Sequence, residues 1–328
     1  MTETSTDTDI RHEQVATNGI ELHVALAGPA DGPPVVLCHG FPELWYSWRH
    51  QLTALAQAGF RVLAPDLRGY GGSTHPEAVD AYGSDQLTAD LCGLLDHYGY
   101  DTAVFSGHDW GAMVVWEMGR LHPERVRAIY AMSVPYSNAG GPPTQVFEHV
   151  FADKFFYMLY FQPVGPAEAE FDADRRHWLR TMLYSASAEG MANGAPGQAD
   201  APREGTRFLH VLTPPPDVLG DWLSEADVDV FVEGLSGGLF GPLCFYRNLD
   251  ANWERSKDIA PSVYTMPAGF LIGAVDPVGH MMPGATEAMA TALPDFRGTT
   301  VVEGAGHWVQ QERPDETNRA MLDFLRSL

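Results

Sequence analysis

Hydrophobic and polar positions follow two patterns in the first 135 residues of the chain. Two short β-prone runs, at residues 15–17 and 20–26, flank Asn18-Gly19, a dipeptide that predicts a hairpin. Continuous apolar runs then predict strands that are buried on both faces, and helical stretches separate them. The predicted strands are 34–38, 60–65, 103–106 and 126–134, and the predicted helices are 47–58, 86–97 and 111–121. Strands that alternate with helices predict a parallel sheet with right-handed crossovers.

The alternation stops between residues 136 and 253, where aromatic clusters, a Gly/Pro/Ala-rich segment and a run of three prolines replace it. We interpret this stretch as a mainly helical cap, or lid, with residues 185–205 as one long mobile loop. Strands at 268–275 and 299–303 and a helix at 314–328 resume the pattern. The predicted organisation is an α/β core of residues 13–135 and 254–328, a cap of residues 136–253, and a disordered tail of residues 1–12.

The charge of the chain narrows the range of its partners. A formal net charge of −23 over 328 residues repels phosphate groups, so nucleic acid and anionic membrane surfaces are poor partners. No apolar run reaches the ~18 residues of a spanning helix, and the first nine residues do not resemble a signal peptide. Three widely spaced cysteines, Cys38, Cys92 and Cys244, form no disulfide framework. These features predict a cytoplasmic protein.

A candidate nucleophile stands where a predicted strand meets a predicted helix. The sequence there is Ser106-Gly107-His108-Asp109-Trp110-Gly111. Gly107 and Gly111 leave room for the sharp turn of a nucleophile elbow, which lifts the central side chain, here Asp109, above the sheet. Alone, a G-x-D-x-G motif also fits a plain turn or a helix N-cap. Its position after an apolar strand and before an amphipathic helix favours the elbow.

Two further residues complete a candidate triad. Asp276 follows the predicted strand 268–275, and His307 follows the strand 299–303 in a loop that contains Gly304 and Gly306. The order nucleophile, acid, histidine is typical of the α/β-hydrolase arrangement. Strand carboxyl ends meet at one edge of such a sheet, so the three side chains can converge despite their separation in sequence.

The loop His39-Gly40-Phe41-Pro42-Glu43 follows the first buried strand and can aim a backbone donor at the site. We expect the N–H groups of Phe41 and of Trp110 to form an oxyanion hole.

An aspartate at the elbow indicates a particular chemistry. Its carboxylate is ionised at neutral pH, so Asp109 can attack a saturated carbon without the help of a base. The product is an alkyl ester, which water activated by His307 can hydrolyse, and Asp276 would orient the imidazole. A serine that attacked the same carbon would leave a stable ether. The sequence therefore favours substitution at epoxides or alkyl halides over ordinary ester hydrolysis.

Taken together, these motifs resemble the soluble epoxide hydrolases of the α/β-hydrolase superfamily, the branch with an aspartate nucleophile and a cap. The resemblance runs from about residue 15 to residue 328 and includes H-G-F-P-E at 39–43, D-L-R-G-Y-G at 66–71, G-H-D-W-G at 107–111 and G-H-W at 306–308. It implies the α/β-hydrolase fold: a mostly parallel central sheet flanked by helices, with a mainly helical cap inserted between core strands.

The resemblance also implies two tyrosines that face the substrate from the cap. By position they are Tyr157, in Y-M-L-Y-F-Q at 157–162, and Tyr246, in G-P-L-C-F-Y-R-N at 241–248. Phenol groups can bind the epoxide oxygen and protonate it as the ring opens. Either tyrosine could be the main proton donor, and Tyr160, three residues after Tyr157, is an alternative.

Two other interpretations stay open. A haloalkane or haloacid dehalogenase of the same superfamily also uses an elbow aspartate. Haloalkane dehalogenases typically have Asn where Phe41 stands, and fluoroacetate dehalogenases typically have Arg where Trp110 stands, so each residue disfavours one of these enzymes. A non-catalytic ligand-binding protein on this scaffold would be expected to lose part of the acid–base set, which here is complete.

The expected substrate is a small apolar epoxide together with water. Trp45, Phe155, Tyr160 and Trp110 are candidate substrate-binding residues. The chemistry needs no organic cofactor, and no Cys/His cluster has the spacing of a metal site. An exposed apolar surface on the cap could support a homodimer.

Overall fold

The structure is a computed structural model that describes residues 9–138, 140–194 and 201–328. Of the tail expected at residues 1–12, residues 1–8 lie outside this description. The first strand, β1 (Arg11–Thr17), begins inside the expected tail. Residues 11 and 12 therefore belong to the sheet, because they pair with Leu26 and Ala25 of the next strand, which corrects the expected extent of the tail.

In the described part of the chain, eight strands form one sheet in the order β1-β2-β4-β3-β5-β6-β7-β8. The remaining strands are β2 (Ile20–Ala27), β3 (Pro34–Cys38), β4 (Arg61–Pro65), β5 (Ala103–His108), β6 (Val126–Met132), β7 (Ala268–Gly273) and β8 (Phe296–Val302). The β1–β2 and β2–β4 pairs are antiparallel, and the pairs from β4 to β8 are parallel. The predicted fold class, a mostly parallel α/β sheet, is confirmed.

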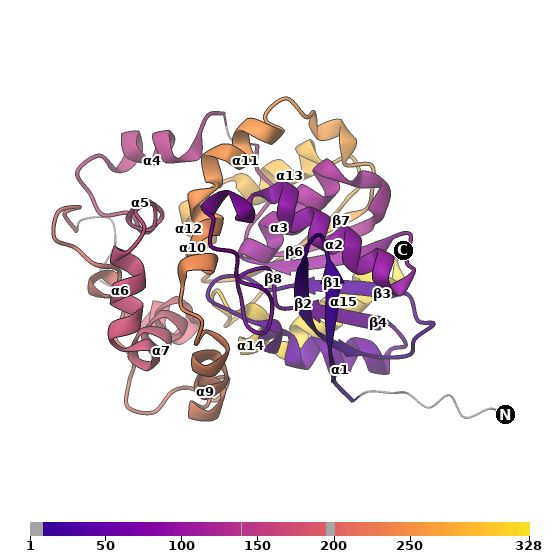
Figure 1. Cartoon of the computed structure of the whole chain (residues 1–328), viewed down its shortest axis with the longest axis horizontal. Helices are drawn as coiled ribbons and strands as arrows, with labels where there is room; N and C mark the ends of the chain where they lie inside the picture. Colours follow the sequence, from indigo (N-terminus) through magenta and orange to yellow (C-terminus); the bar gives the residue numbers. More distant parts are fainter. Residues whose placement is uncertain (1–8, 139, 195–200) are drawn as a thin grey trace.

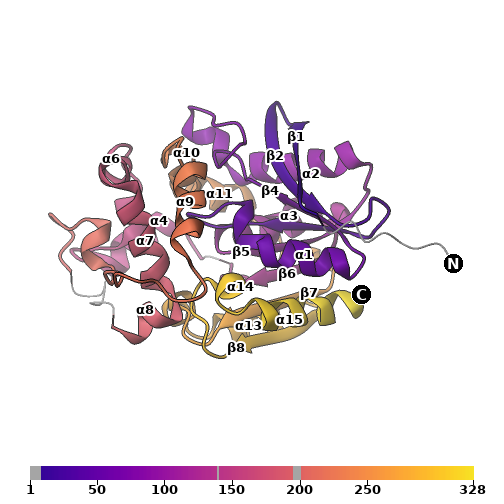
Figure 2. The same ribbon diagram turned by 90° about the horizontal axis from the view of Figure 1, so that it is seen from below.

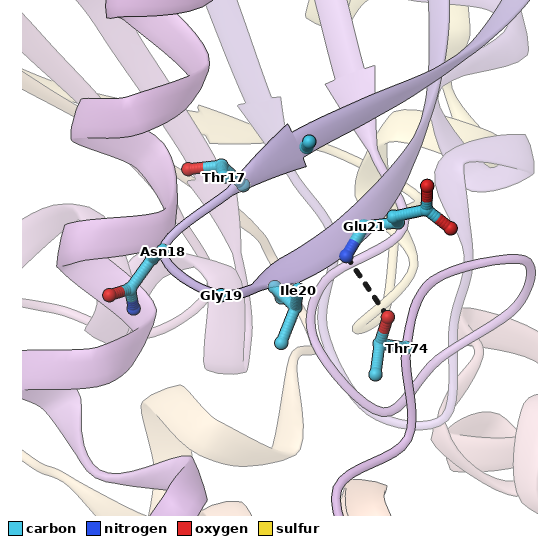
Figure 3. Close-up of a pocket in the computed structure, with 7 residues that line it drawn as sticks. Thr17, Asn18, Gly19, Ile20, Glu21 and Thr74 are labelled. Carbon is cyan, nitrogen blue, oxygen red and sulfur yellow. Dashed lines mark hydrogen bonds between the residues drawn. The ribbon is translucent and has the colours of Figure 1, made fainter.

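The turn between β1 and β2 is the predicted hairpin. Asn18 and Gly19 both have positive φ, 44° and 76°, which suits a tight two-residue turn between twisted strands. The side-chain amide of Asn18 donates to Asp90 Oδ1 at 3.0 Å. The N–H of Glu21 donates to Thr74 Oγ1 at 3.0 Å, as Figure 3 shows. An open depression lies at this turn, but it contains none of the predicted site residues.

Helices cover both faces of the sheet and form two apolar cores. One core includes side chains of α2 (Ser84–Tyr98), α3 (Trp110–Leu121) and α13 (Ala285–Ala292). The other core includes side chains of α1 (Arg49–Gln57) and α15 (Pro314–Arg326), which pack against the opposite face. Two short helices, α12 (Pro277–Met281) and α14 (Val309–Glu312), follow β7 and β8. This layering buries most residues of β3, β4, β5, β6 and β7 on both sides, as their continuous apolar runs predict, whereas the edge strand β8 is largely exposed.

Helices dominate the chain between β6 and β7, and Figures 1 and 2 show most of them beside the sheet. They are α4 (Pro143–Phe151), α5 (Tyr157–Tyr160), α6 (Pro166–Ala173), α7 (Arg175–Ala186), α8 (Ala188–Ala192), α9 (Glu225–Gly234), α10 (Phe240–Arg247) and α11 (Leu249–Ser256). We call residues 136–253 the cap. The boundary expected at residue 253 falls inside α11, whose hydrogen bonds continue to Lys257.

The segment 185–205 differs from the expected single loop. Residues 185 and 186 complete α7, and α8 follows after one residue. Ser187 caps α8, because its hydroxyl accepts the N–H of Gly190 at 3.1 Å. The low apolar content suggested a loop, whereas alanine and an N-cap serine favour a helix here. Residues 195–200 of the segment lie outside the described residues.

Candidate active site

Asp109 occupies a strained turn between β5 and α3. Its backbone has φ 52° and ψ −118°, a conformation that costs free energy in any residue with a side chain. The turn needs glycine on both sides. A Cβ on Gly107 would lie 2.1 Å from the Gly111 carbonyl oxygen, and one on Gly111 would lie 1.9 Å from the Cys38 carbonyl oxygen. The backbone thus has the geometry of a nucleophile elbow.

The three predicted triad residues meet at the carboxyl ends of their strands. Asp109 follows β5, Asp276 follows β7, and His307 lies between β8 and α14. Nε2 of His307 is 3.5 Å from Asp109 Oδ2, and Nδ1 of His307 is 3.1 Å from Asp276 Oδ1. The N–H of Val278 also donates to Asp276 Oδ1, at 2.9 Å, and fixes that carboxylate. The imidazole therefore lies between two carboxylates.

The charges of the three triad residues shift one another's pKa values. Burial alone would lower the pKa of His307, but Asp276 and Asp109 raise it well above its usual value. Burial alone would raise the pKa of Asp109, but the hydrogen bond and charge of His307 outweigh it, and the net pKa is lowered. The resting site therefore contains an ionised nucleophile beside an imidazolium.

Removing the charge of Asp109 should make His307 less basic. In Asp109→Asn one of the two carboxylates that raise the imidazole pKa is neutral, so the pKa of His307 should fall relative to the native protein. NMR titration of histidine-labelled protein measures this shift, with the His307 signal assigned from its loss in His307→Gln. An unchanged or higher pKa would show that Asp109 does not set the charge of the imidazole.

The loop after β3 supplies a donor to the nucleophile. The N–H of Phe41 donates to Asp109 Oδ1 at 2.8 Å, so one carboxylate oxygen already occupies the expected oxyanion position. Trp110, the second expected donor, directly follows Asp109 as the first residue of α3. The two carboxylate oxygens are thus unequal: Oδ1 is held by the backbone, and Oδ2 faces His307.

Tyr157 in α5 and Tyr246 in α10 face this group from the cap. Their ring centroids are 6.0 Å apart, and the ring of Tyr246 lies 5.2 Å from Phe41 and 4.9 Å from Trp110. Burial, and then the negative charge of Asp109, raise the pKa of both phenols. Both hydroxyls therefore keep their protons at neutral pH and can act as hydrogen-bond donors.

The other predicted substrate contacts, Tyr160, Phe155 and Trp45, each have partners outside the triad. Tyr160 donates its hydroxyl to Glu170 Oε2 at 2.7 Å, so this hydroxyl already has an acceptor within the cap. Phe155 is buried and packs 5.5 Å from the ring of Tyr160. Trp45 packs against the rings of His12, His23 and Tyr46 near β1 and β2 rather than against the triad. An apolar side chain in a sequence gives no sign of which core it joins.

Other aromatic side chains line the space around the two cap tyrosines. Phe161 lies 5.7 Å from the ring of Tyr157 and 5.1 Å from that of Tyr246. Phe208 and Trp178 extend the group, with centroids 6.2 Å from Tyr157 and 6.0 Å from Phe41 respectively. The sequence contained a signal for Phe161, since it stands in the same 157–162 motif as Tyr157.

Sequence reasoning missed a buried pair, His108 and Glu43, next to Asp109. Nδ1 of His108 is 2.7 Å from Glu43 Oε2, and Nε2 of His108 is 2.7 Å from the His307 carbonyl oxygen. Gln310 and Gln311 donate to Glu43 Oε1 at 3.0 and 3.1 Å. Both ring nitrogens of His108 thus face oxygen atoms, one from the loop after β3 and one from the backbone of His307. The positions of the two residues, in the 39–43 loop and next to Asp109, were the available signal.

Residues 9–138, 140–194 and 201–328 contain no group of three or more His, Cys, Asp or Glu side chains arranged to hold a metal ion. No helix within these same ranges has the length and apolar character needed to cross a bilayer.

Comparisons with known proteins agree with this geometry. A family profile described as "alpha/beta hydrolase fold" matches residues 33–180. The chain is 45% identical to epoxide hydrolase A of Mycobacterium tuberculosis over 96% of this chain and 97% of that protein, and 37% identical to epoxide hydrolase 1 of Siraitia grosvenorii over 97% and 98%. The crystal structure of epoxide hydrolase A from Mycobacterium thermoresistibile superposes with a TM-score of 0.87 at 44% identity, covering 97% of this chain and 98% of that one.

The fold and the site thus define an enzyme of the α/β-hydrolase class that has an aspartate at the elbow after β5. Within that class, the chain belongs to the epoxide hydrolase family.

Proposed function

We propose that this protein hydrolyses epoxides to vicinal diols in two steps, through an alkyl ester of Asp109. The observation that carries the proposal is an aspartate, rather than a serine, at the elbow, with the phenols of a partly buried Tyr157 and a buried Tyr246 facing it from the cap. The carboxylate suits attack on a saturated carbon, and the phenols suit the oxygen that leaves.

In the first step, Asp109 Oδ2 attacks an epoxide carbon, and the bond from that carbon to the ring oxygen breaks. Oδ1 stays on the Phe41 N–H, which leaves Oδ2 as the free oxygen. Tyr157 and Tyr246 bind the ring oxygen, and one of them transfers its proton to the developing alkoxide. The products are a neutral ester, an alcohol and a phenolate.

Ester formation prepares His307 for the second step. The ester carries no charge, so one of the two carboxylates that raise the pKa of His307 is removed and its pKa falls. The proton that the imidazole loses restores the phenol. Neutral His307, oriented by Asp276, then takes a proton from water, and the hydroxide attacks the ester carbon.

Collapse of the resulting tetrahedral intermediate releases the diol. Its oxyanion is Oδ1, which the Phe41 N–H already holds, and Trp110 would provide the second donor. The bond between the carboxyl carbon and the alkyl oxygen breaks, and the remaining hydroxyl proton of the acid passes to that oxygen. Asp109 ends as a carboxylate beside an imidazolium, which is the resting state.

The residues around the site indicate an apolar substrate. Six aromatic side chains, together with the nucleophile's neighbour Trp110, lie in contact around the space between core and cap: Phe41, Tyr157, Phe161, Trp178, Phe208 and Tyr246. Such walls bind apolar surface and exclude water, which strengthens the polar contacts at the epoxide oxygen.

Turnover of an aryl epoxide tests the proposal. Native protein incubated with styrene oxide should produce the corresponding diol, and Asp109→Ala should produce none above the uncatalysed rate. A bromoalkane incubated in parallel should release no bromide. Bromide release without diol formation would show a dehalogenase, and neither product from well-folded protein would contradict the enzymatic proposal.

We further propose a cytoplasmic protein that forms a homodimer through the cap. Cys38, Cys92 and Cys244 are free thiols, which suits a reducing compartment. Val146 and Val150, one turn apart on α4, are 45% and 63% exposed and offer an apolar surface to a second copy. Light scattering with native protein and with a Val146→Ser/Val150→Ser variant tests this surface.

A further inference from the structure

Glu312, the last residue of α14, is a buried carboxylate held by backbone amides. Only 6% of the residue is exposed. The N–H of Gly306 donates to both of its oxygens at 3.1 Å, and the N–H of Trp308 donates to Oε1 at 3.1 Å. The N–H of Ala188 donates to Oε2 at 2.8 Å. An acceptor with these bonds fixes the position of each donor relative to the others.

The three donors come from two parts of the fold. Gly306 and Trp308 are the residues immediately before and after His307, whereas Ala188 is the first residue of α8 in the cap. The N–H of His307 itself donates to the carbonyl oxygen of Ala186, the last residue of α7, at 2.9 Å. The loop between β8 and α14 contains His307, and we call it the histidine loop. It is therefore bound to the junction between α7 and α8, residues 186–188.

The packing between these two segments leaves no room for adjustment. A Cβ on Gly306 would lie 2.4 Å from the Ala188 nitrogen and 2.6 Å from the Ala186 carbonyl oxygen. On its other side, the carbonyl oxygen of His307 accepts from His108 Nε2 at 2.7 Å and from Ser133 Oγ at 3.1 Å. The core thus holds one side of the His307 backbone, and the cap and Glu312 hold the other.

We propose that Glu312 is a positioning residue that joins the cap to the histidine loop and so places His307 for hydrolysis of the alkyl ester. This inference rests on the proposed two-step function. It assigns Glu312 to the second step, because attack on the epoxide needs Asp109, Phe41 and the cap tyrosines, none of which bonds to Glu312 in the described structure. A base displaced by about 1 Å can lose on the order of 10²-fold in rate.

Glu312→Gln tests the proposal with little change in volume. One carboxylate oxygen becomes an NH₂ group, which cannot accept the N–H of Ala188 or of Gly306, so at least one bond is lost. We expect ester hydrolysis to slow by about 10-fold or more, on the scale of such displacements, with little change in ester formation. Slowing only the second of two steps lowers kcat and KM together and leaves kcat/KM nearly unchanged.

Two measurements and two further variants complete the experiment. Steady-state kinetics with styrene oxide should show the paired fall in kcat and KM, and intact mass during turnover should show accumulated adduct. Glu316→Gln, an exposed glutamate one turn into α15, is the matched control and should behave like the native protein. Glu312→Asp keeps the charge but shortens the side chain, and it tests the same geometry if the glutamine variant does not fold.

The outcomes separate the two proposals. Equal loss of kcat and kcat/KM without adduct, in a Glu312 variant of native secondary structure, would overturn the positioning role. So would an adduct that accumulates equally in Glu316→Gln. If the native protein forms neither diol nor adduct from the epoxide, the proposed function itself is wrong, whatever the Glu312 variants do.

Discussion

His307→Gln should accumulate as a covalent ester of Asp109 when mixed with styrene oxide, and its kcat should fall by about 10³-fold or more. The carboxylate attacks without a base, so ester formation survives the substitution, although the imidazolium no longer assists it. Hydrolysis needs a base for water, and removing a general base costs about 10²–10⁴-fold. Glutamine keeps much of the volume between Asp109 and Asp276 but cannot accept a proton from water.

Intact mass spectrometry checks this result. The protein mass should rise by the mass of the whole epoxide, and peptide mapping should place the adduct on Asp109. His280→Gln, which replaces an exposed histidine in α12, is the matched control and should turn over normally without adduct. The same mass increase in an Asp109→Ala/His307→Gln double variant would show that another residue is the nucleophile.

Replacing both cap tyrosines should cause the second large loss, in the rate of ester formation. One donor to a developing oxyanion is worth about 10²–10³-fold, so Tyr157→Phe and Tyr246→Phe should each lower the rate of ester formation by about 10²-fold. The double variant should lose about 10³–10⁴-fold, because no phenol remains to protonate the alkoxide. The free energy of unfolding should change little, since each substitution removes one oxygen that faces the site.

Single-turnover quenching followed by mass measurement reports the rate of ester formation. Tyr160→Phe is the informative control, since its hydroxyl is bonded to Glu170 and should contribute little to the rate. A loss in Tyr160→Phe as large as that in Tyr157→Phe would reassign the proton donor. Comparison of the two single variants also identifies which of Tyr157 and Tyr246 is the main donor.

The elbow and the triad residues could be predicted because each is marked by a short stretch of neighbouring sequence. A glycine-flanked elbow, a strand followed by Asp276 and a strand followed by His307 each leave a short signature, and parallel topology brings strand ends together. The parallel strands from β3 to β7 could be predicted equally well, since burial on both faces produces continuous apolar runs.

The rest depends on contacts between distant segments. Glu43 and His108 are 65 positions apart, and nothing in either motif states that a carboxylate faces that ring. Tyr160 shares a helix with Tyr157, but Glu170 engages its hydroxyl, which residue spacing alone does not indicate. Trp45 is aromatic and close in sequence to Phe41, yet its ring joins a different cluster near the hairpin.

The Phe41 N–H binds Oδ1 of Asp109 but not Oδ2, and this difference determines where one oxygen atom of the diol comes from. Oδ2 leaves with the alkyl group, so the first diol carries an oxygen of the protein rather than of the solvent. Water then fills the vacant place, while Oδ1 stays on the Phe41 N–H. If the carboxylate does not rotate between turnovers, the attacking oxygen of each cycle is the one acquired from water in the cycle before. Each molecule of diol after the first would then contain a solvent oxygen that entered the enzyme one turnover earlier.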